Sequence, residues 1–413
     1  MRAVTWQGHR DIRVADVPDP TIIDPTDAVI RITSTALCGS DLHLYEVLTM
    51  FLEPGDILGH EPMGIVEAVG SAVTHIAPGD RVVIPFNISC GSCFMCTRSL
   101  HSQCETTQVV AEDKGAALFG YTKLYGQVPG GQAEYLRVPQ AHFGPIKVPD
   151  DGTPDERWLF LSDVLPTAWQ AVEYANVPPN GTVAVFGLGP IGQMAARIAR
   201  HRGAGQVLGV DRVPERLAMA HRHGITPIDA TEGDVVAHLR QYSAGRGPDS
   251  VIDAVGMEAH GNLLAATAQR AAGLLPSKVS AALTERIGVD RLSVLHDAFD
   301  AVRRGGTVSI SGVYGGMVDP MPMMTLFDKQ IQLRMGQANV HAWVDQILPL
   351  LSDGADPLGV DDLATHRVPL EQAADAYRMF QRKDDGAIKV VFDPALRPPP
   401  APMEQGSALS VPA

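Results

Sequence analysis

The sequence lacks the features that would direct it to a membrane or to nucleic acid. No stretch approaches the ~18 apolar residues that a membrane-spanning helix requires, and the N-terminus has no apolar core of signal-peptide length. We therefore expect a cytoplasmic protein without a membrane partner. No run rich in Lys or Arg is present, and 33 basic against 47 acidic residues give a net charge of −14. Such a surface repels phosphates, so a nucleic acid is not an expected partner.

Cysteine is also scarce, with five residues in a chain of 413. Four of them fall within 15 residues, which is too crowded for a disulfide framework in a large chain expected in the cytoplasm. Their spacing, Cys-x2-Cys-x2-Cys-x7-Cys, allows four thiolates to converge on one zinc ion and leaves no open position for a substrate. We therefore predict a structural zinc site in a lobe over residues 88–106, rather than four free buried cysteines: Cys90, Cys93, Cys96 and Cys104.

The pattern of strands and helices that the sequence predicts changes along the chain. Residues 1–158 contain short β-type runs separated by Pro and Gly, which predicts a small irregular β-barrel. From about residue 180 strands alternate with helical segments, so residues 159–335 are expected to form a doubly wound parallel sheet, and the fold class is α/β. Residues 336–393 are expected to return to the first domain, and the Pro-rich residues 394–413 to be disordered.

A glycine-rich turn predicts a nucleotide site. The sequence GLGPIG at 187–192 follows an apolar strand and precedes a helix, and Asp211 lies 19 residues further on, the spacing of the dinucleotide fingerprint. A carboxylate at Asp211 would bind the ribose hydroxyls and repel a 2′-phosphate, which favours NAD, although Arg212 could admit some NADP. The expected coenzyme-binding residues here are Gly187, Gly189, Pro190, Ile191, Gly192, Asp211, Arg212, Arg216 and Val313.

A third group of residues precedes the cysteine lobe. The sequence CGSDLH at 38–43 is followed by GHE at 59–61, so one thiol and two imidazoles come with a Ser and two carboxylates. A zinc ion with an open coordination position fits this set. A third protein ligand is required, and spacing alone does not name it. The alternative is that these side chains are ordinary core residues and solvated loop carboxylates.

The order of these motifs resembles the zinc-dependent medium-chain alcohol dehydrogenases, from Met1 to about Pro394. Four further stretches are most similar to the glutathione-independent formaldehyde dehydrogenases and formaldehyde dismutases: IPFNISCGSCFMC (84–96), GGQAEY (130–135), SDVLPT (162–167) and DAVGMEAHG (253–261). The resemblance implies a GroES-like catalytic domain, a Rossmann coenzyme domain, and a homo-oligomer, either a dimer or a homotetramer.

The resemblance also implies roles for individual residues. Cys38, His60 and Asp163 match the catalytic zinc ligands, and the four cysteines of the lobe match the structural zinc ligands. Ser40 and His43 match a proton relay, Asp41 and Glu61 match groups around the metal, Thr167 matches a residue beside the nicotinamide, and Lys389 matches a basic residue at the pyrophosphate.

Two stretches depart from that pattern. Trp169 and Gln170 replace side chains usual in the formaldehyde-type enzymes, and residues 261–304 do not align with them. The second stretch has apolar residues at helical spacing, which predicts an added helical segment. The resemblance implies that this segment covers the adenosine side of NAD, and the alternative is a surface hairpin or an oligomer contact.

The expected activity is therefore the interconversion of an alcohol and an aldehyde by hydride transfer with NAD, using two zinc ions per chain. Polyol or threonine-type dehydrogenases, and an aldehyde dismutase with tightly bound NAD, are the alternatives within the family. A zinc-free reductase would lack both zinc motifs, and a non-catalytic nucleotide-binding protein would not need Ser40 and His43 beside Cys38.

Overall fold

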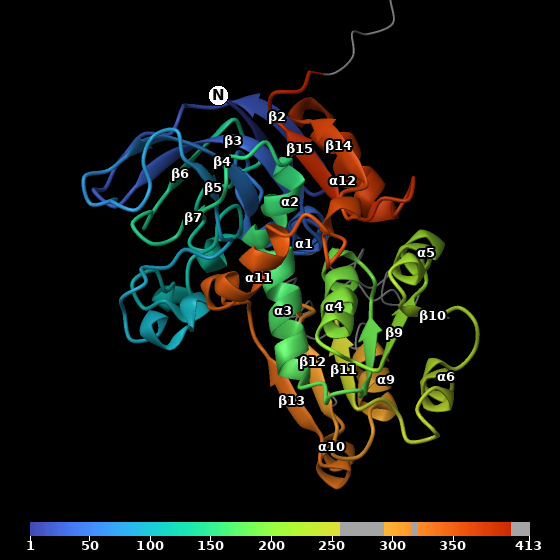
Figure 1. Cartoon of the computed structure of the whole chain (residues 1–413). Coiled ribbons are helices and arrows are strands. Elements are labelled where there is room, and N and C mark those ends of the chain that lie inside the picture. The colour runs from blue at the N-terminus through green and yellow to red at the C-terminus, as the bar shows by residue number, and fades with distance from the viewer. Residues whose placement is uncertain (257–292, 315–320, 398–413) are drawn as a thin grey trace, which may run out of the picture.

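The computed structural model describes residues 1–256, 293–314 and 321–397 (Figure 1). The stretch 261–304, expected to be an insertion, therefore falls outside the described residues up to residue 292, as do residues 398–413 of the expected disordered tail.

The first region is built on a seven-stranded, mostly antiparallel sheet with the order β14-β15-β3-β4-β5-β7, in which β6 also pairs with β3. Strands β1 and β2 form a separate antiparallel pair. The elements of this region are β1 (Arg2–Gly8), β2 (Asp11–Asp16), β3 (Ala28–Leu37), α1 (Gly39–Glu46), β4 (Glu61–Val69), β5 (Arg81–Val83), β6 (Tyr135–Val138), β7 (Ile146–Lys147), α2 (Asp155–Leu159), β14 (His366–Pro369), α12 (Ala373–Arg382) and β15 (Val390–Asp393).

The second region is a six-stranded parallel sheet with the order β10-β9-β8-β11-β12-β13. This is the predicted doubly wound arrangement, which confirms the expected fold class. Its elements are α3 (Val164–Ala175), β8 (Thr182–Phe186), α4 (Pro190–His201), β9 (Gln206–Asp211), α5 (Pro214–Arg222), β10 (Thr226–Asp229), α6 (Val235–Gln241), β11 (Ser250–Asp253), α9 (Ser293–Ala301), β12 (Thr307–Ile310), α10 (Met323–Lys329) and β13 (Gln332–Met335), followed by α11 (Val344–Leu351).

Alternation along the central strands places helices on both faces of the parallel sheet. In β8, Val183 and Val185 join the core that contains α3, α4 and α5, whereas Ala184 and Phe186 join the core that contains α6 and α9. Successive side chains of a strand point to opposite faces, so a strand buried on both sides reads as a continuous apolar run.

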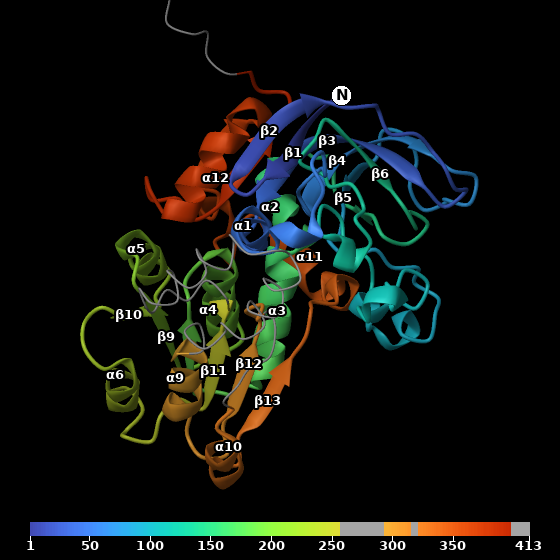
Figure 2. The same ribbon diagram turned by 180° about the vertical axis from the view of Figure 1, so that it is seen from behind.

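The two regions share one core and are joined by α3. This helix runs from the β region at the top of Figures 1 and 2 down along the parallel sheet. The largest apolar cluster contains Met63 and Phe86 from the first region together with Val183 and Met194 from the second. Of the returning strands, β15 pairs with β3 and β14 pairs with β15, while the exact domain boundaries stay a prediction.

Candidate metal and coenzyme sites

Strand register brings the first site together. Cys38 directly follows β3 and His60 directly precedes β4, and these strands pair antiparallel with Ala36 opposite Glu61. The end of β3 therefore lies beside the start of β4, which places Cys38 next to His60. On the other side of β3, Leu37 is opposite Val390 of β15, so Lys389 also reaches this end of the sheet.

Asp163 completes the cluster from a different direction. It lies between a 3-10 turn (Phe160–Ser162) and the first residue of α3. Its Oδ2 is 3.8 Å from Cys38 Sγ and 3.5 Å from His60 Nε2. Potential ligand atoms of Cys38, His60, Glu61 and Asp163 all lie within 4.8 Å of one another, and all four residues are buried.

The chemistry of this cluster fits a divalent metal. Burial, together with the nearby Glu61 carboxylate, raises the pKa of the Cys38 thiol. Burial would lower the pKa of His60, but Asp41 and Cys38 raise it well above its usual range. A cation among these groups would stabilise the thiolate and balance the buried carboxylates. Sulfur, nitrogen and oxygen donors are the set that zinc accepts, so the residues fit the group.

Two further charged side chains, those of Asp41 and Lys389, contact members of the cluster. The carboxylate of Asp41 lies with Oδ1 3.3 Å from His60 Nδ1, and its Oδ2 accepts the backbone N–H of Cys38 at 2.9 Å. The ammonium of Lys389 donates to Glu61 Oε1 at 2.6 Å and to the carbonyl oxygen of Leu37 at 3.1 Å, and both charged side chains are fully buried. The structure thus places Lys389 beside the metal-ligand cluster, paired with Glu61, and its contact with a pyrophosphate stays a prediction.

The other expected residues of the first site lie around this cluster. Ser40 Oγ is 3.2 Å from His60 Nε2, and Ser40 is half-buried. His43 is buried one turn further along α1. The Thr167 hydroxyl donates to Asp163 Oδ1 at 2.5 Å, so this residue, expected beside the nicotinamide, also holds the Asp163 carboxylate.

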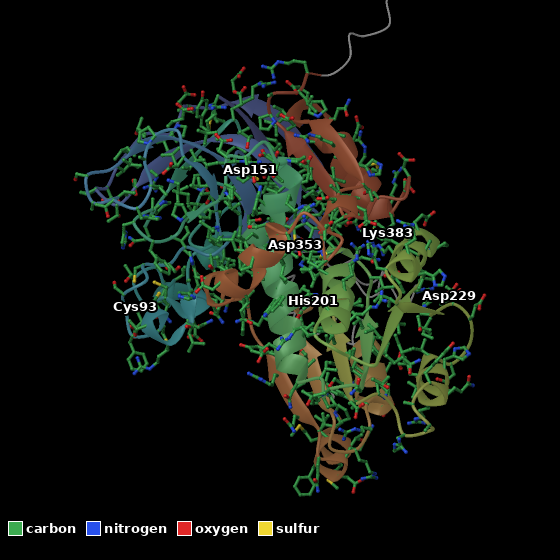
Figure 3. The ribbon with its side chains drawn as sticks, in the orientation of Figure 1. Cys93, Asp151, His201, Asp229, Asp353 and Lys383 are labelled. Carbon is green, nitrogen blue, oxygen red and sulfur yellow. The ribbon has the colours of Figure 1, made fainter. Side chains whose placement is uncertain are left out.

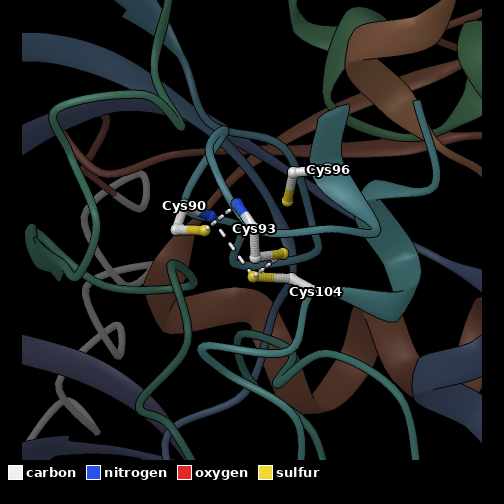
Figure 4. Close-up of side chains that lie close together, drawn as sticks. All are labelled: Cys90, Cys93, Cys96 and Cys104. Carbon is white, nitrogen blue, oxygen red and sulfur yellow. Dashed lines mark hydrogen bonds between the residues drawn. The ribbon is translucent and has the colours of Figure 1, made fainter. Parts of the chain in front are cut away.

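The four cysteines of the lobe form the second cluster, on one side of the β region, where Cys93 is labelled in Figure 3. Their sulfur atoms lie within 4.8 Å of one another and point toward a common centre (Figure 4). Burial raises the pKa of Cys90, but hydrogen bonds from the Thr106 hydroxyl and from backbone N–H groups lower it to about 5. The set fits a metal that takes four thiolates.

The glycine-rich turn has the backbone that its sequence predicts. Gly187 has φ +83°, and a Cβ at Gly192 would lie 1.7 Å from the carbonyl oxygen of Gly187, so a side chain at residue 192 would clash. Gly189 is the N-cap of α4, and Pro190 is its first residue, where a missing N–H is tolerated. Backbone N–H groups at a helix N-terminus bind anions such as a pyrophosphate.

Asp211 ends β9 directly beside this turn. Its carboxylate accepts the backbone N–H groups of Leu188 at 2.7 Å, Arg212 at 2.7 Å and Val213 at 2.9 Å. Arg216 lies 3.6 Å from Asp211 and 3.8 Å from the position of a Cβ on Gly189. Ile191 is the second residue of α4, and Val313 follows β12 at the carboxyl end of the sheet with 49% of its surface exposed.

Sequence reasoning missed several residues near the metal-ligand cluster. Neither the ion pair between Lys389 and Glu61 nor the contacts of Gln132 and Tyr377 described below were expected. A signal for Gln132 was present, because it belongs to GGQAEY, but that motif indicated only a resemblance.

The departures Trp169 and Gln170 have a structural explanation. Gln170 is buried and binds Asn339 and the carbonyl oxygens of Gly336 and Gln337, while Trp169 donates to Gln346. These contacts fix α3 to the segment that leaves β13.

The described helices include none that is long and apolar enough to cross a bilayer.

Comparisons with known proteins match both regions of the chain. Residues 24–150 match the alcohol dehydrogenase GroES-like domain, and residues 190–273 match the zinc-binding dehydrogenase family. A zinc-type alcohol dehydrogenase-like protein of Bacillus subtilis is 41% identical over 95% of this chain and 100% of its own length. Formaldehyde dismutase of Pseudomonas putida is 31% identical over 95% of this chain and 97% of its own. The structure of alcohol dehydrogenase TADH from Thermus sp. ATN1 has a TM-score of 0.78 and 36% identity, covering 95% of this chain and 99% of that one.

Proposed function

Because the chain belongs to the zinc-type, medium-chain alcohol dehydrogenase family and is therefore an oxidoreductase, we propose that it interconverts alcohols and aldehydes by hydride transfer with NAD. The observation that carries the proposal is the buried convergence of a thiol, an imidazole and a carboxylate at Cys38, His60 and Asp163, beside the hydroxyl of Ser40. These three residues would hold one zinc ion, and the four cysteines of the lobe would hold a second.

The protein's own residues would prepare this chemistry. When bound, zinc supplies a Lewis acid that lowers the pKa of an alcohol hydroxyl, and the nicotinamide supplies the hydride acceptor. With a divalent ion bound, the Cys38 thiolate and the Asp163 carboxylate would be two anions that balance its charge. Ser40 would accept the alcohol proton at its Oγ, and His43, an imidazole that can take up and release a proton, would carry it outward. Thr167 would keep the Asp163 carboxylate in place.

Two aromatic side chains close to His60 favour the proposal that the substrate is small. The ring centroids of Phe86 and Tyr121 each lie 6.4 Å from that of His60, in edge-to-face geometry. Bulky rings this close to a metal ligand restrict the space for a substrate, which favours a short aldehyde such as formaldehyde over a polyol. The similarity to formaldehyde dismutase points the same way. A cover over bound NAD by residues 261–304 stays a prediction.

A panel of aldehydes and alcohols, formaldehyde included, tests the activity with and without added NAD. Reduction of NAD that requires an alcohol supports a dehydrogenase. Conversion of aldehyde to acid and alcohol without added NAD, together with near-stoichiometric NAD(H) released on denaturation, would instead establish a dismutase. Zinc-loaded protein that turns over no member of the panel would contradict the proposal.

The preference for NAD is proposed to depend on Asp211. Its carboxylate lies beside the glycine-rich turn, where it would bind ribose hydroxyls and repel a 2′-phosphate. Asp211→Ser should shift the ratio of kcat/KM values toward NADP, because Arg212 and Arg216 would then be available to a phosphate. An unchanged ratio would show that Asp211 does not contact the ribose.

We further propose a homo-oligomer assembled through the parallel sheet. Among the described residues β13 is an edge strand, and Met335 on it is 57% exposed. The adjacent α10 exposes Met324 and Phe327 at 77% and 81%, and exposed apolar side chains that gather on one surface often mark a protein contact. Light scattering should give a dimer or tetramer that Phe327→Glu weakens, and a monomeric wild-type protein would refute this assembly. Cytoplasmic location stays a prediction.

A further inference from the structure

A buried polar side chain lies behind the metal-ligand cluster and belongs to none of the roles considered above. Gln132 follows the two glycines of the GGQAEY motif and has no exposed surface. Its Nε2 lies 3.3 Å from Asp41 Oδ2 and 3.4 Å from the carbonyl oxygen of Ala36. Its Oε1 is 2.9 Å from the hydroxyl of Tyr377.

The hydrogen-bond chemistry fixes the direction of these contacts. A carboxylate and a backbone carbonyl only accept hydrogen bonds, so the amide nitrogen of Gln132 must face Asp41 and Ala36. Its carbonyl oxygen must then accept, and the Tyr377 hydroxyl must donate. Tyr377 is fully buried on α12, in the segment that returns to the first region. The amide of Gln132 therefore has one possible orientation.

The orientation of the Gln132 amide determines which oxygen atom of Asp41 faces His60. Asp41 Oδ2 receives two donors, the Cys38 N–H and the Gln132 amide, which leaves Oδ1 facing His60 Nδ1 at 3.3 Å. Neither of the two facing atoms has another hydrogen-bond partner among the described residues. With a metal ion at Nε2, the proton of the imidazole would be on Nδ1 and face Asp41, and the lone pair of Nε2 would point toward Cys38 and Asp163.

The backbone around His60 is held by the same motif. Gly131 N–H donates to the carbonyl oxygen of Gly59 at 2.8 Å, and Gln132 N–H donates to that of Leu58 at 2.9 Å. Gly59 has φ +95°, and a Cβ there would lie 2.3 Å from Gln132 Cγ. Gln132 is thus packed against the residue that precedes His60.

We infer that Gln132 and Tyr377 are positioning residues for the catalytic metal, acting through Asp41 to fix the orientation and tautomer of the His60 imidazole. The inference rests on the proposed function, because it requires a metal at Cys38, His60 and Asp163. It assigns to the returning segment a part in metal binding, in addition to its part in the sheet.

Metal affinity is the test, measured on full-length protein with its four-cysteine zinc retained. The metal of the other site is removed with a chelator, and Zn²⁺ affinity is measured by competition with a chromophoric chelator. Co²⁺ binding is followed by its visible absorption bands, which report ligand geometry. Gln132→Met keeps the size of the side chain and removes its polar atoms, while Tyr377→Phe removes one hydroxyl.

Gln132→Met should weaken Zn²⁺ binding about tenfold or more and shift the Co²⁺ bands, as loss of partners around metal ligands commonly does. Tyr377→Phe acts through one further hydrogen bond and should weaken binding about threefold. Tyr377→Phe should add nothing in the Gln132→Met background, because its effect passes through the amide. In both variants kcat should fall more than KM rises.

Tyr45→Phe is the matched control. The ring of Tyr45 is also buried, 5.7 Å from that of Tyr377, and no described hydrogen bond links it to Gln132. It should leave metal affinity and the Co²⁺ bands unchanged. Wild-type affinity and bands in both Gln132→Met and Tyr377→Phe, or independent additive effects, would overturn the inference alone. Failure of the wild-type site to bind metal would overturn the proposed function as well. If Gln132→Met loses the lobe zinc through misfolding, Tyr377→Phe against Tyr45→Phe still decides.

Discussion

The two metal-ligand clusters are constructed in opposite ways. The four cysteines come from 15 consecutive residues of one surface lobe and carry one kind of donor. The other cluster takes Cys38, His60 and Asp163 from the ends of separate elements, up to 125 residues apart, and mixes three kinds of donor. The first cluster can thus hold its own loop together, whereas the second depends on a completed fold.

The residues around the two clusters differ in the same way: those around the lobe are near in sequence, and those around the mixed cluster come from distant segments. In the lobe, the sulfur of Cys90 accepts local hydrogen bonds from the Thr106 hydroxyl and from the backbone N–H of Cys93. The mixed cluster is surrounded by buried charged groups from distant segments, above all Asp41 and the Lys389–Glu61 pair. A metal should therefore contribute mainly to folding at the lobe, and mainly to chemistry at the mixed cluster.

Single ligand substitutions test this division most strongly. Cys104→Ser should destabilise the whole lobe, because structural zinc in small domains contributes about 10 kcal/mol or more to folding at neutral pH. Cys38→Ser should abolish activity while the fold survives. Thermal unfolding and proteolysis of the lobe measure the first effect, and turnover measures the second. Equal melting temperatures of the two variants would contradict the division.

Metal removal sharpens the same comparison without mutation. If Cys38, His60 and Asp163 are its ligands, the mixed cluster would have one fewer protein ligand than the lobe and an open position. Mild chelation should then remove about half of the zinc together with all activity. Atomic absorption and turnover are followed in the same samples, and added Zn²⁺ should restore both. Fully active protein with one zinc per chain would show that the assignment of two sites is wrong.

The contrast also explains what the sequence could predict. The alternating texture after residue 180 and the glycine-rich turn are local patterns, and the structure and the comparisons confirm the fold class that they predicted. The cysteine spacing is equally local. Asp163 followed only from a resemblance, because no spacing relates it to Cys38 or His60.

Contacts set by strand register could not be read from the sequence. Lys389 reaches Glu61 because β15 pairs with β3 in one particular register, with Val390 opposite Leu37. A shift by one residue would turn its side chain to the other face of the sheet. The bond from Tyr377 to Gln132 spans 245 positions of the sequence and depends equally on where the returning segment docks.

The buried pair of Lys389 and Glu61 provides a test on the mixed cluster that involves no metal ligand proposed here. Lys389→Met would leave a buried carboxylate without its partner, which should lower the free energy of unfolding by about 3–5 kcal/mol. The double variant with Glu61→Gln should recover much of this loss. Arg31→Met, which breaks the exposed pair with Glu67, is the control and should change little. A Lys389→Met protein as stable as the control would show that the pair does not stabilise the fold.

The smallest expected change in stability involves His341, which packs beside the lobe. The centroid of its ring lies 4.3 Å from that of Phe143 and 5.6 Å from that of His101. Its Nε2 donates to the carbonyl oxygen of Gly144 at 2.8 Å. Burial is the main cause that lowers the pKa of His341 from 6.5 to about 4, and His101 and His75 add to the shift. Burial also lowers the pKa of His101.

The sign of the pH dependence follows from this lowered pKa. Between pH 6.5 and about 4 the unfolded chain binds a proton at His341 that the folded chain does not. The free energy of unfolding is therefore unaffected by this histidine above pH 6.5 and falls as the pH drops toward 4. The loss should reach at most about 3 kcal/mol. His341→Gln keeps a donor for Gly144 and removes the titrating group, so its melting temperature should fall less steeply with acid than that of the wild type. His9→Gln, at an exposed turn, should follow the wild-type curve. If the melting temperatures of His341→Gln and the wild type fall in parallel with pH, the protonation of His341 does not lower the stability of the protein in acid.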